Sequence, residues 1–545
     1  MAVLPLSEVT VYENGHIWPG LGVSESGFTE AMAVSAGVVL GVGTNYELAD
    51  RFPSAQRVDL AGHTLIPGLI DAHNHAIRGG ATWARELHWS LLRTREEALA
   101  SIRRRAASTP AGTWISAIGG WHQTQFAGTW LPSRAELDEV APDHPVYVQS
   151  LYEVGIANSA AIDAVDLASA ARRLPDLVQV DAAGSPTGTV TGLPAYNLFI
   201  AAVGAPSAEE QIAGTRQMFR DFAGLGITGM CDPGGFGMTP EAYDAIYALW
   251  DRGQVDVRTR MYVSATDVGQ EFEQIEGWVR HAHRGFGDEW LSLTGIGEIV
   301  HFGCHDFEGL HEFAISDAAV EELYRISCIV AARGWPMHVH AVMDESIDRI
   351  LDCWERVHAV TPIDGLRFSL AHGDRIGPRN IQRLKALGIG LEVDARQVFR
   401  SSASQAVWGP DAMRTVPLLA DLLEAGIHVG VGSDATRASS HNPWLSLWWL
   451  VAGRSFDGSS QRDARHLLSR AQALDLHTRG SAWFSSEEEH RGRLQPGFLS
   501  DFTVLSADYF AVPTDDIPQL NAELTVVGDR VTYSSGLLAE PTADL

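Results

Sequence analysis

Two histidines follow a short apolar run near the start of the chain. The run Leu65–Ile70 leads directly into Asp71-Ala72-His73-Asn74-His75. Because side chains at positions i and i+2 of a strand point to the same face, His73 and His75 are expected to present two imidazoles together. Imidazoles are common ligands of Zn²⁺ and similar ions, so the pair predicts part of a metal site. The alternative is an exposed histidine-rich turn, because short motifs also arise by chance.

Three later apolar runs end in further side chains that can bind a metal. These runs are Met337–His340, Leu370–Asp374 and Val429–Asp434. If the runs are parallel strands of one barrel, their C-terminal ends meet at one mouth, where His340, His372 and Asp434 would join the first pair. Any one of them could instead be an ordinary strand-end polar group. His338 is better interpreted as a hydrogen-bonded core histidine, because it lies two residues deeper.

The hydrophobic pattern predicts the elements that would position these residues. Short apolar strands alternate with helical stretches, which is typical of a parallel sheet. The candidate strands are Thr64–His75, Ile227–Asp232, Arg258–Ala265, Leu293–His301, Pro336–Ala341, Arg367–His372, Ile389–Asp394 and Ile427–Asp434. Eight such strands predict an α/β fold with a closed (β/α)₈ barrel. The stretch between the first two strands is far longer than a usual βα connection, so it predicts an inserted subdomain or lid.

Strand signals also cluster at both ends of the chain. They cover Glu8–Tyr12, Ala31–Gly43 and Arg57–Leu60 at one end, and Asp501–Leu505 and Leu524–Tyr533 at the other. The two clusters could pair into one small β-domain.

Composition excludes several classes of protein. The 545 residues are 45% hydrophobic, and acidic residues outnumber basic ones by 68 to 40, which gives a net charge of −28. Such a chain repels phosphate backbones and anionic membrane surfaces. No run approaches the roughly 18–20 apolar residues of a membrane span, and the N-terminus lacks a signal-peptide layout. We therefore expect a cytoplasmic protein with no nucleic-acid or membrane partner.

Longer motifs carry a resemblance to a known family. They are Val58–His75 (VDLAGHTLIPGLIDAHNH), Leu131–Asp138 (LPSRAELD) and Gly492–Leu505 (GRLQPGFLSDFTVL). The sequence resembles the amidohydrolase superfamily, and within it the long group that includes N-substituted formamide deformylase and the YtcJ-like proteins. The resemblance implies a distorted (β/α)₈ TIM barrel with a β-sandwich built from both termini. The expected parts are residues 1–63 and 486–545 for the sandwich, 64–77 for the first barrel strand, 78–223 for the insertion and 224–485 for the rest of the barrel.

The resemblance also implies the ligand positions. The matching residues are His73 and His75 in the first strand, His340 in the fifth, His372 in the sixth and Asp434 in the eighth. Many relatives carry a carboxylated lysine in the fourth strand that bridges two metals. This chain has no lysine there, and its sole lysine, Lys385, lies in a helical run. We therefore expect Glu298 to be the fourth-strand or bridging ligand; the alternative is an ion-paired Glu298 with a single metal bound elsewhere.

The insertion departs from the pattern of long relatives, which often have a Gly-His pair before an Asn-Ser. Here Glu153 stands in place of that histidine, so specificity has shifted if Glu153 faces the substrate. The other candidates for the pocket wall are Trp121, His122, Tyr152, His301, His305 and Arg437. Each of these is, taken alone, more typical of packing or of the surface. The sixteen tryptophans are compatible with an apolar or aromatic substrate, although core packing explains most of them.

The expected activity is hydrolysis of a carbon–nitrogen bond in a small amide-like substrate. One or two divalent ions, with Zn²⁺ the expected metal, would lower the pKa of a bound water toward about 7. Asp434 would act as general base and then acid, with His340 as a second catalytic residue. An N-substituted formamide is the substrate if the resemblance extends that far, and family members are often dimers or larger. The alternatives are a mononuclear deaminase, carbon–carbon hydrolase or decarboxylase, and a catalytically silent binding protein of the same fold.

Overall fold

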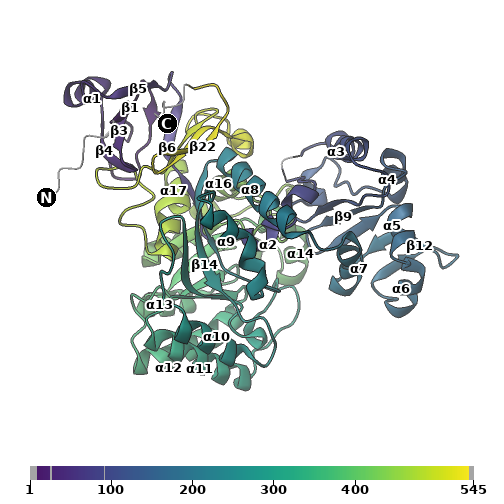
Figure 1. The fold of residues 1–545 in the computed structure, drawn as a ribbon. Coiled ribbons are helices and arrows are strands. Elements are labelled where there is room, and N and C mark those ends of the chain that lie inside the picture. The colour runs from purple at the N-terminus through teal and green to yellow at the C-terminus, as the bar shows by residue number, and fades with distance from the viewer. Residues whose placement is uncertain (1–8, 25–26, 91, 539–545) are drawn as a thin grey trace.

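An eight-stranded parallel barrel forms the centre of the molecule (Figure 1). The computed structural model describes residues 9–24, 27–90 and 92–538. The barrel strands, in order, are β7 (Leu69–Asp71), β13 (Ile227–Asp232), β14 (Arg258–Val263), β15 (Leu291–Glu298), β16 (Met337–Ala341), β17 (Ser369–His372), β18 (Gly390–Asp394) and β19 (Val429–Gly432). The amide of Ala72 donates to the carbonyl of Val431 at 3.0 Å, which brings the last strand against the first. The predicted α/β barrel is confirmed.

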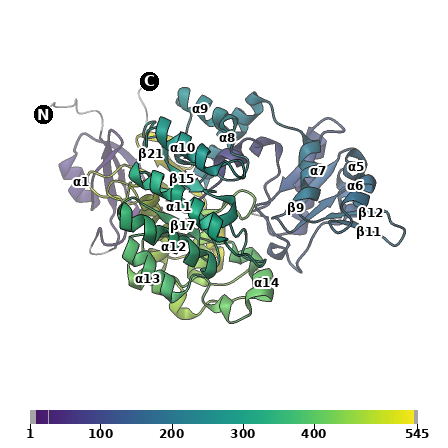
Figure 2. The ribbon, with the colours of Figure 1, turned by 90° about the horizontal axis from the view of Figure 1, so that it is seen from below.

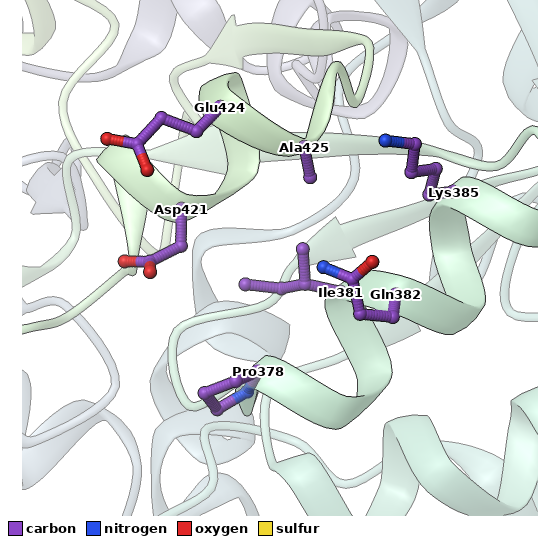
Figure 3. Close-up of a pocket in the computed structure, with 7 residues that line it drawn as sticks. All are labelled: Pro378, Ile381, Gln382, Lys385, Asp421, Glu424 and Ala425. Carbon is purple, nitrogen blue, oxygen red and sulfur yellow. The ribbon is translucent and has the colours of Figure 1, made fainter.

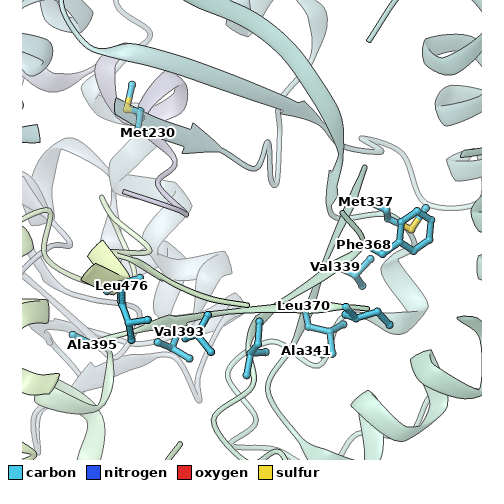
Figure 4. Packing of buried hydrophobic residues seen from close by; sticks show 14 of the residues in the cluster. Met230, Met337, Val339, Ala341, Phe368, Leu370, Val393, Ala395 and Leu476 are labelled. Carbon is cyan, nitrogen blue, oxygen red and sulfur yellow. The ribbon is translucent and has the colours of Figure 1, made fainter. Parts of the chain in front are cut away.

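Alternation along β16 shows how the barrel separates its core from its chemistry. Met337, Val339 and Ala341 belong to the main hydrophobic cluster (Figure 4), whereas His338 and His340 point to the other face. This is the two-residue period expected of a strand. The surrounding helices include α8 (Ala208–Gly224), α9 (Asp244–Asp251), α10 (Glu271–His281), α11 (Asp317–Ala332), α12 (Asp344–Val360), α13 (Pro378–Leu387), α14 (Gln397–Trp408), α15 (Leu419–Ala425) and α16 (Pro443–Ala452). Figure 2 shows several of them around the sheet.

The two ends of the chain form a pair of packed sheets. The first has the order β4 (Val38–Gly43), β3 (Ala31–Ser35), β1 (Thr10–Glu13) and β5 (Gln56–Asp59). The second has the order β2 (His16–Ile17), β6 (Thr64–Pro67), β20 (Phe502–Leu505), β21 (Ala522–Val527) and β22 (Arg530–Ser534). Tyr12, Leu65 and Phe502 share one hydrophobic cluster, so the sheets bury a common core. Glu8, in the first expected strand, lies outside the described residues.

The expected strand Thr64–His75 is divided between two sheets. β6 pairs with β20 in the terminal sheets, and only Leu69–Asp71 pairs in the barrel. The division falls at Pro67-Gly68: proline has no N–H to donate, and a Cβ at Gly68 would lie 2.2 Å from Thr228. His73 and His75 therefore follow β7 rather than continuing it.

The insertion is a separate lobe, on the right in Figures 1 and 2. Its sheet has the order β11 (Val178–Val180), β12 (Pro186–Val190), β10 (Val154–Ala157), β9 (Val146–Ser150) and β8 (Ile115–Ile118). Its helices are α3 (Arg95–Ser108), α4 (Arg134–Val140), α5 (Ser159–Ala164), α6 (Leu167–Arg173) and α7 (Leu193–Val203). Two hydrophobic clusters of its own support it, one around Trp89 and Trp121 and one around Tyr147 and Phe199. Among the described residues, no helix is both long and apolar enough to cross a membrane.

Candidate metal centre

The six expected ligands converge at the C-terminal ends of the barrel strands, and each is exposed by 5% or less. The Glu298 carboxylate lies among the imidazoles. Its Oε1 lies 3.3 Å from Nε2 of His75, and its Oε2 lies 3.5 Å from Nε2 of His73, 3.4 Å from Nδ1 of His340 and 3.8 Å from Nε2 of His372. Asp434 Oδ1 lies 3.3 Å from Nε2 of His75. Glu298 thus stands between one histidine pair and the other.

Two buried atoms in this cluster fit a bound cation. Nε2 of His73 and Oε2 of Glu298 have no hydrogen-bond partner among the residues that the structure describes. Buried polar atoms are nearly always paired, so two such atoms 3.5 Å apart and facing each other need an explanation. A donor set of imidazoles and carboxylates suits Zn²⁺ or a similar divalent ion. These residues therefore fit the metal that the resemblance implies.

Each histidine is oriented through its second ring nitrogen. Nδ1 of His75 bonds the Gly234 carbonyl at 2.9 Å, and Nε2 of His340 bonds the Phe307 carbonyl at 2.6 Å. Nδ1 of His372 bonds the Asp394 carboxylate at 2.7 Å. Such partners fix the ring and its tautomer, and the other ring nitrogen of each histidine faces the cluster. There Nε2 of His372 and Nδ1 of His340 lie 2.9 Å apart and share a hydrogen bond.

His338 supports the remaining histidine. Its Nε2 shares a 3.0 Å hydrogen bond with Nδ1 of His73, and its Nδ1 bonds the Ser369 hydroxyl at 2.8 Å. The structure therefore places His338 as a buried, hydrogen-bonded histidine, and adds that it holds His73.

Left-handed backbone directs two of the ligands into the barrel mouth. Alternation along β17 would place His372 on the same face as Leu370, which belongs to the hydrophobic cluster. His372 instead has φ of 73°, and Asp434, just after β19, has φ of 52°. Non-glycine residues rarely adopt such angles, and those that do are concentrated at functional sites.

Neighbouring charges shift the pKa values within the cluster. Burial raises the pKa of Asp434, but His75, His73 and Arg396 outweigh it and lower the pKa below its ordinary value. Burial lowers the pKa of His340, but its bonds with Asp306 and Glu298 dominate and raise the pKa to about 9. At neutral pH Asp434 is therefore a carboxylate, the form that can accept a proton.

Two of the expected pocket residues approach the barrel mouth from the insertion. Glu153 Oε2 lies 2.8 Å from Nε2 of His122, and Glu153 Oε1 lies 3.9 Å from Nε of Arg400 on α14. Burial raises the pKa of Glu153, but His122 and Arg400 outweigh it and lower the pKa.

A chain of alternating charges connects this pair to the candidate ligands. Arg400 pairs with Glu308, and Nη1 of Arg396 lies 3.1 Å from Glu308 and 3.8 Å from Asp434. Sequence reasoning missed Arg396, Arg400, Glu308 and also Asp394. Asp394 ends a predicted strand as His372 does, so the same strand-end rule could have found it.

Two other expected pocket residues, Trp121 and Arg437, contact the insertion. Trp121 is fully buried in the core of the insertion, and its indole N–H donates to Ala117. Arg437 pairs with Glu86 and donates to the Ile118 carbonyl, so it ties the insertion to the barrel. Neither residue has a contact with the six candidate ligands among the interactions described.

Tyr152 and His301 also contact other parts of the protein. The carbonyl of Tyr152 accepts a bond from the hydroxyl of Tyr196, and the Tyr152 side chain is about one-third exposed. Nε2 of His301 lies 3.5 Å from Glu322, and His301 groups with Glu271 and Glu322 outside the cluster around Glu298. Neither residue has a contact with the six candidate ligands among the described interactions.

Aromatic rings line one side of the mouth. His305 stacks on His340 at 3.7 Å between ring centroids, and the rings of Phe307 and Phe236 lie 4.9 and 5.1 Å from His305. Phe236 and Phe307 are 41% and 53% exposed. An apolar surface therefore extends from a candidate ligand to the solvent, on the loops after β13 and β15.

Lys385 lies on α13 and is not among the residues that gather around Glu298. It lines a groove of about 240 Å³ between α13 and α15, together with Asp421 and Glu424 (Figure 3). The chain's only lysine therefore cannot supply a carboxylated bridge.

Two known proteins are similar in sequence over most of this chain. YtcJ of Bacillus subtilis, which is named as an amidohydrolase, is 28% identical and aligns over 96% of this chain and 99% of its own. N-substituted formamide deformylase of Arthrobacter pascens is 25% identical over 92% of this chain and 95% of its own.

Solved structures share the fold. A metal-dependent hydrolase of Pyrococcus horikoshii covers 93% of this chain and 99% of its own, with 19% identity and a TM-score of 0.65. Atrazine chlorohydrolase TrzN of Arthrobacter aurescens, crystallised with zinc, covers 96% of this chain and 94% of its own, with 14% identity and a TM-score of 0.52. The model of the amidohydrolase family matches residues 56–533, and the chain therefore belongs to the amidohydrolase family.

Proposed function

We propose that this protein is a metal-dependent hydrolase that cleaves a carbon–nitrogen bond, other than a peptide bond, in a small amide-like molecule. The observation that carries the proposal is the Glu298 carboxylate within 3.3–3.8 Å of four histidine nitrogens. His73, His75 and Asp434 would hold one ion and His340 and His372 a second, with Glu298 shared between them. A divalent ion, Zn²⁺ by preference, would lower the pKa of a bound water toward about 7 and polarise the substrate carbonyl.

Asp434 carries the proton in this proposal. Its carboxylate is deprotonated, because His75, His73 and Arg396 outweigh the effect of burial on its pKa. It accepts a proton from the attacking water and releases it to the leaving nitrogen, so that one group serves as base and then as acid. Both ring nitrogens of His340 face other groups, so we assign His340 as a ligand rather than as a proton carrier.

The mouth of the barrel favours an apolar substituent on the substrate. The exposed rings of Phe236 and Phe307 lead directly to His305 and His340. An N-substituted formamide with an apolar amine portion fits this surface, and the name of the Arthrobacter pascens relative supports the choice. The Glu153–His122 pair lies next to Arg400 on α14 at the same mouth. We assign this pair as the contact for a polar part of the substrate.

The test is hydrolysis by metal-reconstituted protein and by Asp434→Asn. N-substituted formamides, simple amides, hydantoins and carbamates are assayed for release of the amine. We expect turnover of an amide or formamide, and a loss of about 10²–10⁴-fold in kcat for Asp434→Asn, the range of general acid–base catalysis. The variant must keep its metal content and its thermal unfolding midpoint. Unchanged turnover by that variant would exclude Asp434 as the proton carrier, and no hydrolysis of any carbon–nitrogen substrate would exclude the proposed reaction.

A further inference from the structure

A groove beside α8 is lined by three arginines whose side chains make no described hydrogen bond or ion pair. Figures 1 and 2 show α8 and α9 side by side on the outside of the barrel. The cavity has a volume of about 570 Å³, and Arg216, Arg220 and Arg252 line it. Within the part of the chain that the structure describes, none of these guanidinium groups makes a hydrogen bond or an ion pair, and Nε of Arg216 is buried without a partner.

Two of these arginines carry like charges close together on one helix. Arg216 and Arg220 lie one helical turn apart, and like charges at that spacing destabilise a helix. The chain has 68 acidic residues for 40 basic ones, and many of its other arginines pair with a carboxylate. Glu209 is the only acidic side chain that lines the described groove, and it lies about two turns from Arg216 on α8. A bound anion would therefore relieve the repulsion.

The wall opposite α8 is held in place. Arg530 on β22 donates hydrogen bonds to the carbonyls of Gly253 and Val255, next to Arg252. The guanidinium of Arg530 also lies 3.7 Å from the ring centroid of Trp290 and 3.8 Å from the carboxylate of Asp256. Arg530 therefore fixes the segment that carries Arg252. The carboxylate of Asp256 also interacts electrostatically with Arg216 and Arg220, although it makes no described ion pair with them.

We propose that this groove binds the phosphoryl group of a small phosphate ester or polyphosphate. Guanidinium groups match phosphate oxygens in both geometry and charge. A cavity of this volume lies within the range of small-molecule sites, and the side-chain amides of Gln217 and Gln254 add polar contacts. Arg252 and Gln254 precede β14, whereas the candidate metal ligands follow strand ends, so the groove is distinct from the metal centre.

Binding of inorganic phosphate, measured by isothermal titration calorimetry, tests the proposal. The variant is Arg216→Gln/Arg220→Gln, and the control is Arg103→Gln/Arg104→Gln, which removes two exposed arginines of α3. We expect saturable binding that weakens at least about tenfold in the first variant and stays unchanged in the control. Arg252 follows α9 rather than lying on α8, and Arg252→Gln should also weaken phosphate binding. This single variant replaces the double variant in the test if the double variant is unstable.

Three outcomes would overturn the proposal. Phosphate binding that survives Arg216→Gln/Arg220→Gln would place the anion elsewhere, for example at the metal centre. Equal losses in both double variants would show a general effect of charge. Absence of phosphate binding would also refute the proposal. If, in addition, only Arg216→Gln/Arg220→Gln changed the sedimentation coefficient of the protein, the groove would be a contact for an acidic protein surface.

Discussion

Removal of Glu298 tests whether one carboxylate serves two metal ions. In Glu298→Ala both carboxylate oxygens are lost, although they face different histidines: Oε1 lies 3.3 Å from His75 and Oε2 lies 3.4 Å from His340. An ion near the first pair would keep His73, His75 and Asp434 as ligands. An ion near the second pair would keep only His340 and His372.

The expected effect follows from these remaining ligands. Loss of a residue that merely orients a ligand weakens metal binding about 10–100-fold, so loss of a ligand itself should cost at least as much. An ion left with two protein ligands should then be removed by dialysis, while an ion with three is retained. The metal content should fall from about two equivalents per chain to about one.

The measurement is elemental analysis after dialysis against metal-depleted buffer. Glu392→Gln is the matched control, because Glu392 is fully buried in the same interior, 3.7 Å from Nδ1 of His73. Burial and the nearby charge of Asp394 raise the pKa of Glu392 well above its ordinary value, which favours the protonated, neutral carboxyl group. The uncharged amide of glutamine has the same shape and charge. The control should retain about two equivalents. A Glu298→Ala protein that binds as much metal as the unsubstituted protein would refute the assignment.

Three further predictions concern the support of the site and of the fold. Asp394→Asn should weaken metal affinity about 10–100-fold, measured by competition with a chromogenic chelator, because it loosens the histidine that Asp394 holds at 2.7 Å; an unchanged affinity would contradict this role. Asp501→Asn should lower the free energy of unfolding by about 1.5–3 kcal/mol in urea denaturation, because buried Arg258 and Arg491 lose the carboxylate that they share and keep only Glu289 and Glu487; a loss below about 1 kcal/mol would argue otherwise. Glu487→Gln should flatten the acid limb of the stability curve. Burial raises the pKa of Glu487, but Arg491 and Arg260 together outweigh it and the net pKa is depressed. The contribution of Glu487 to stability is therefore present above about pH 4.3 and is lost as pH falls; identical acid limbs for the two proteins would contradict this.

The barrel was predictable because its strands are short apolar runs that end in polar residues. The predicted strand Ile227–Asp232 is observed with the same bounds, and most others differ by a few residues at their ends. The strand-end rule named His73, His75, His340, His372 and Asp434, and the resemblance added Glu298, whose carboxylate lies among the four imidazoles. Their types and positions are local features, which a sequence displays directly.

The surroundings of the cluster depend on contacts between distant segments. The row of charged side chains that links Glu153 to Asp434 consists of Arg400, Glu308 and Arg396. The sequence next to each of these residues does not indicate its partners. The surroundings of Trp121 and Arg437 were not predictable either: Trp121 packs in the core of the insertion, and Arg437 pairs with Glu86. The inward turn of His372 depends on a backbone angle that strand alternation does not predict.

Closure of the barrel has a consequence for biogenesis. The carbonyl of His73 accepts hydrogen bonds from the amides of Ser433 and Asp434, so the first and last candidate ligands are joined by the seam itself. A nascent or truncated chain that lacks β19 has neither this seam nor the final carboxylate. Ligands that are far apart in sequence bind a metal together only after the chain has folded. We therefore expect the metal to bind after the barrel has closed.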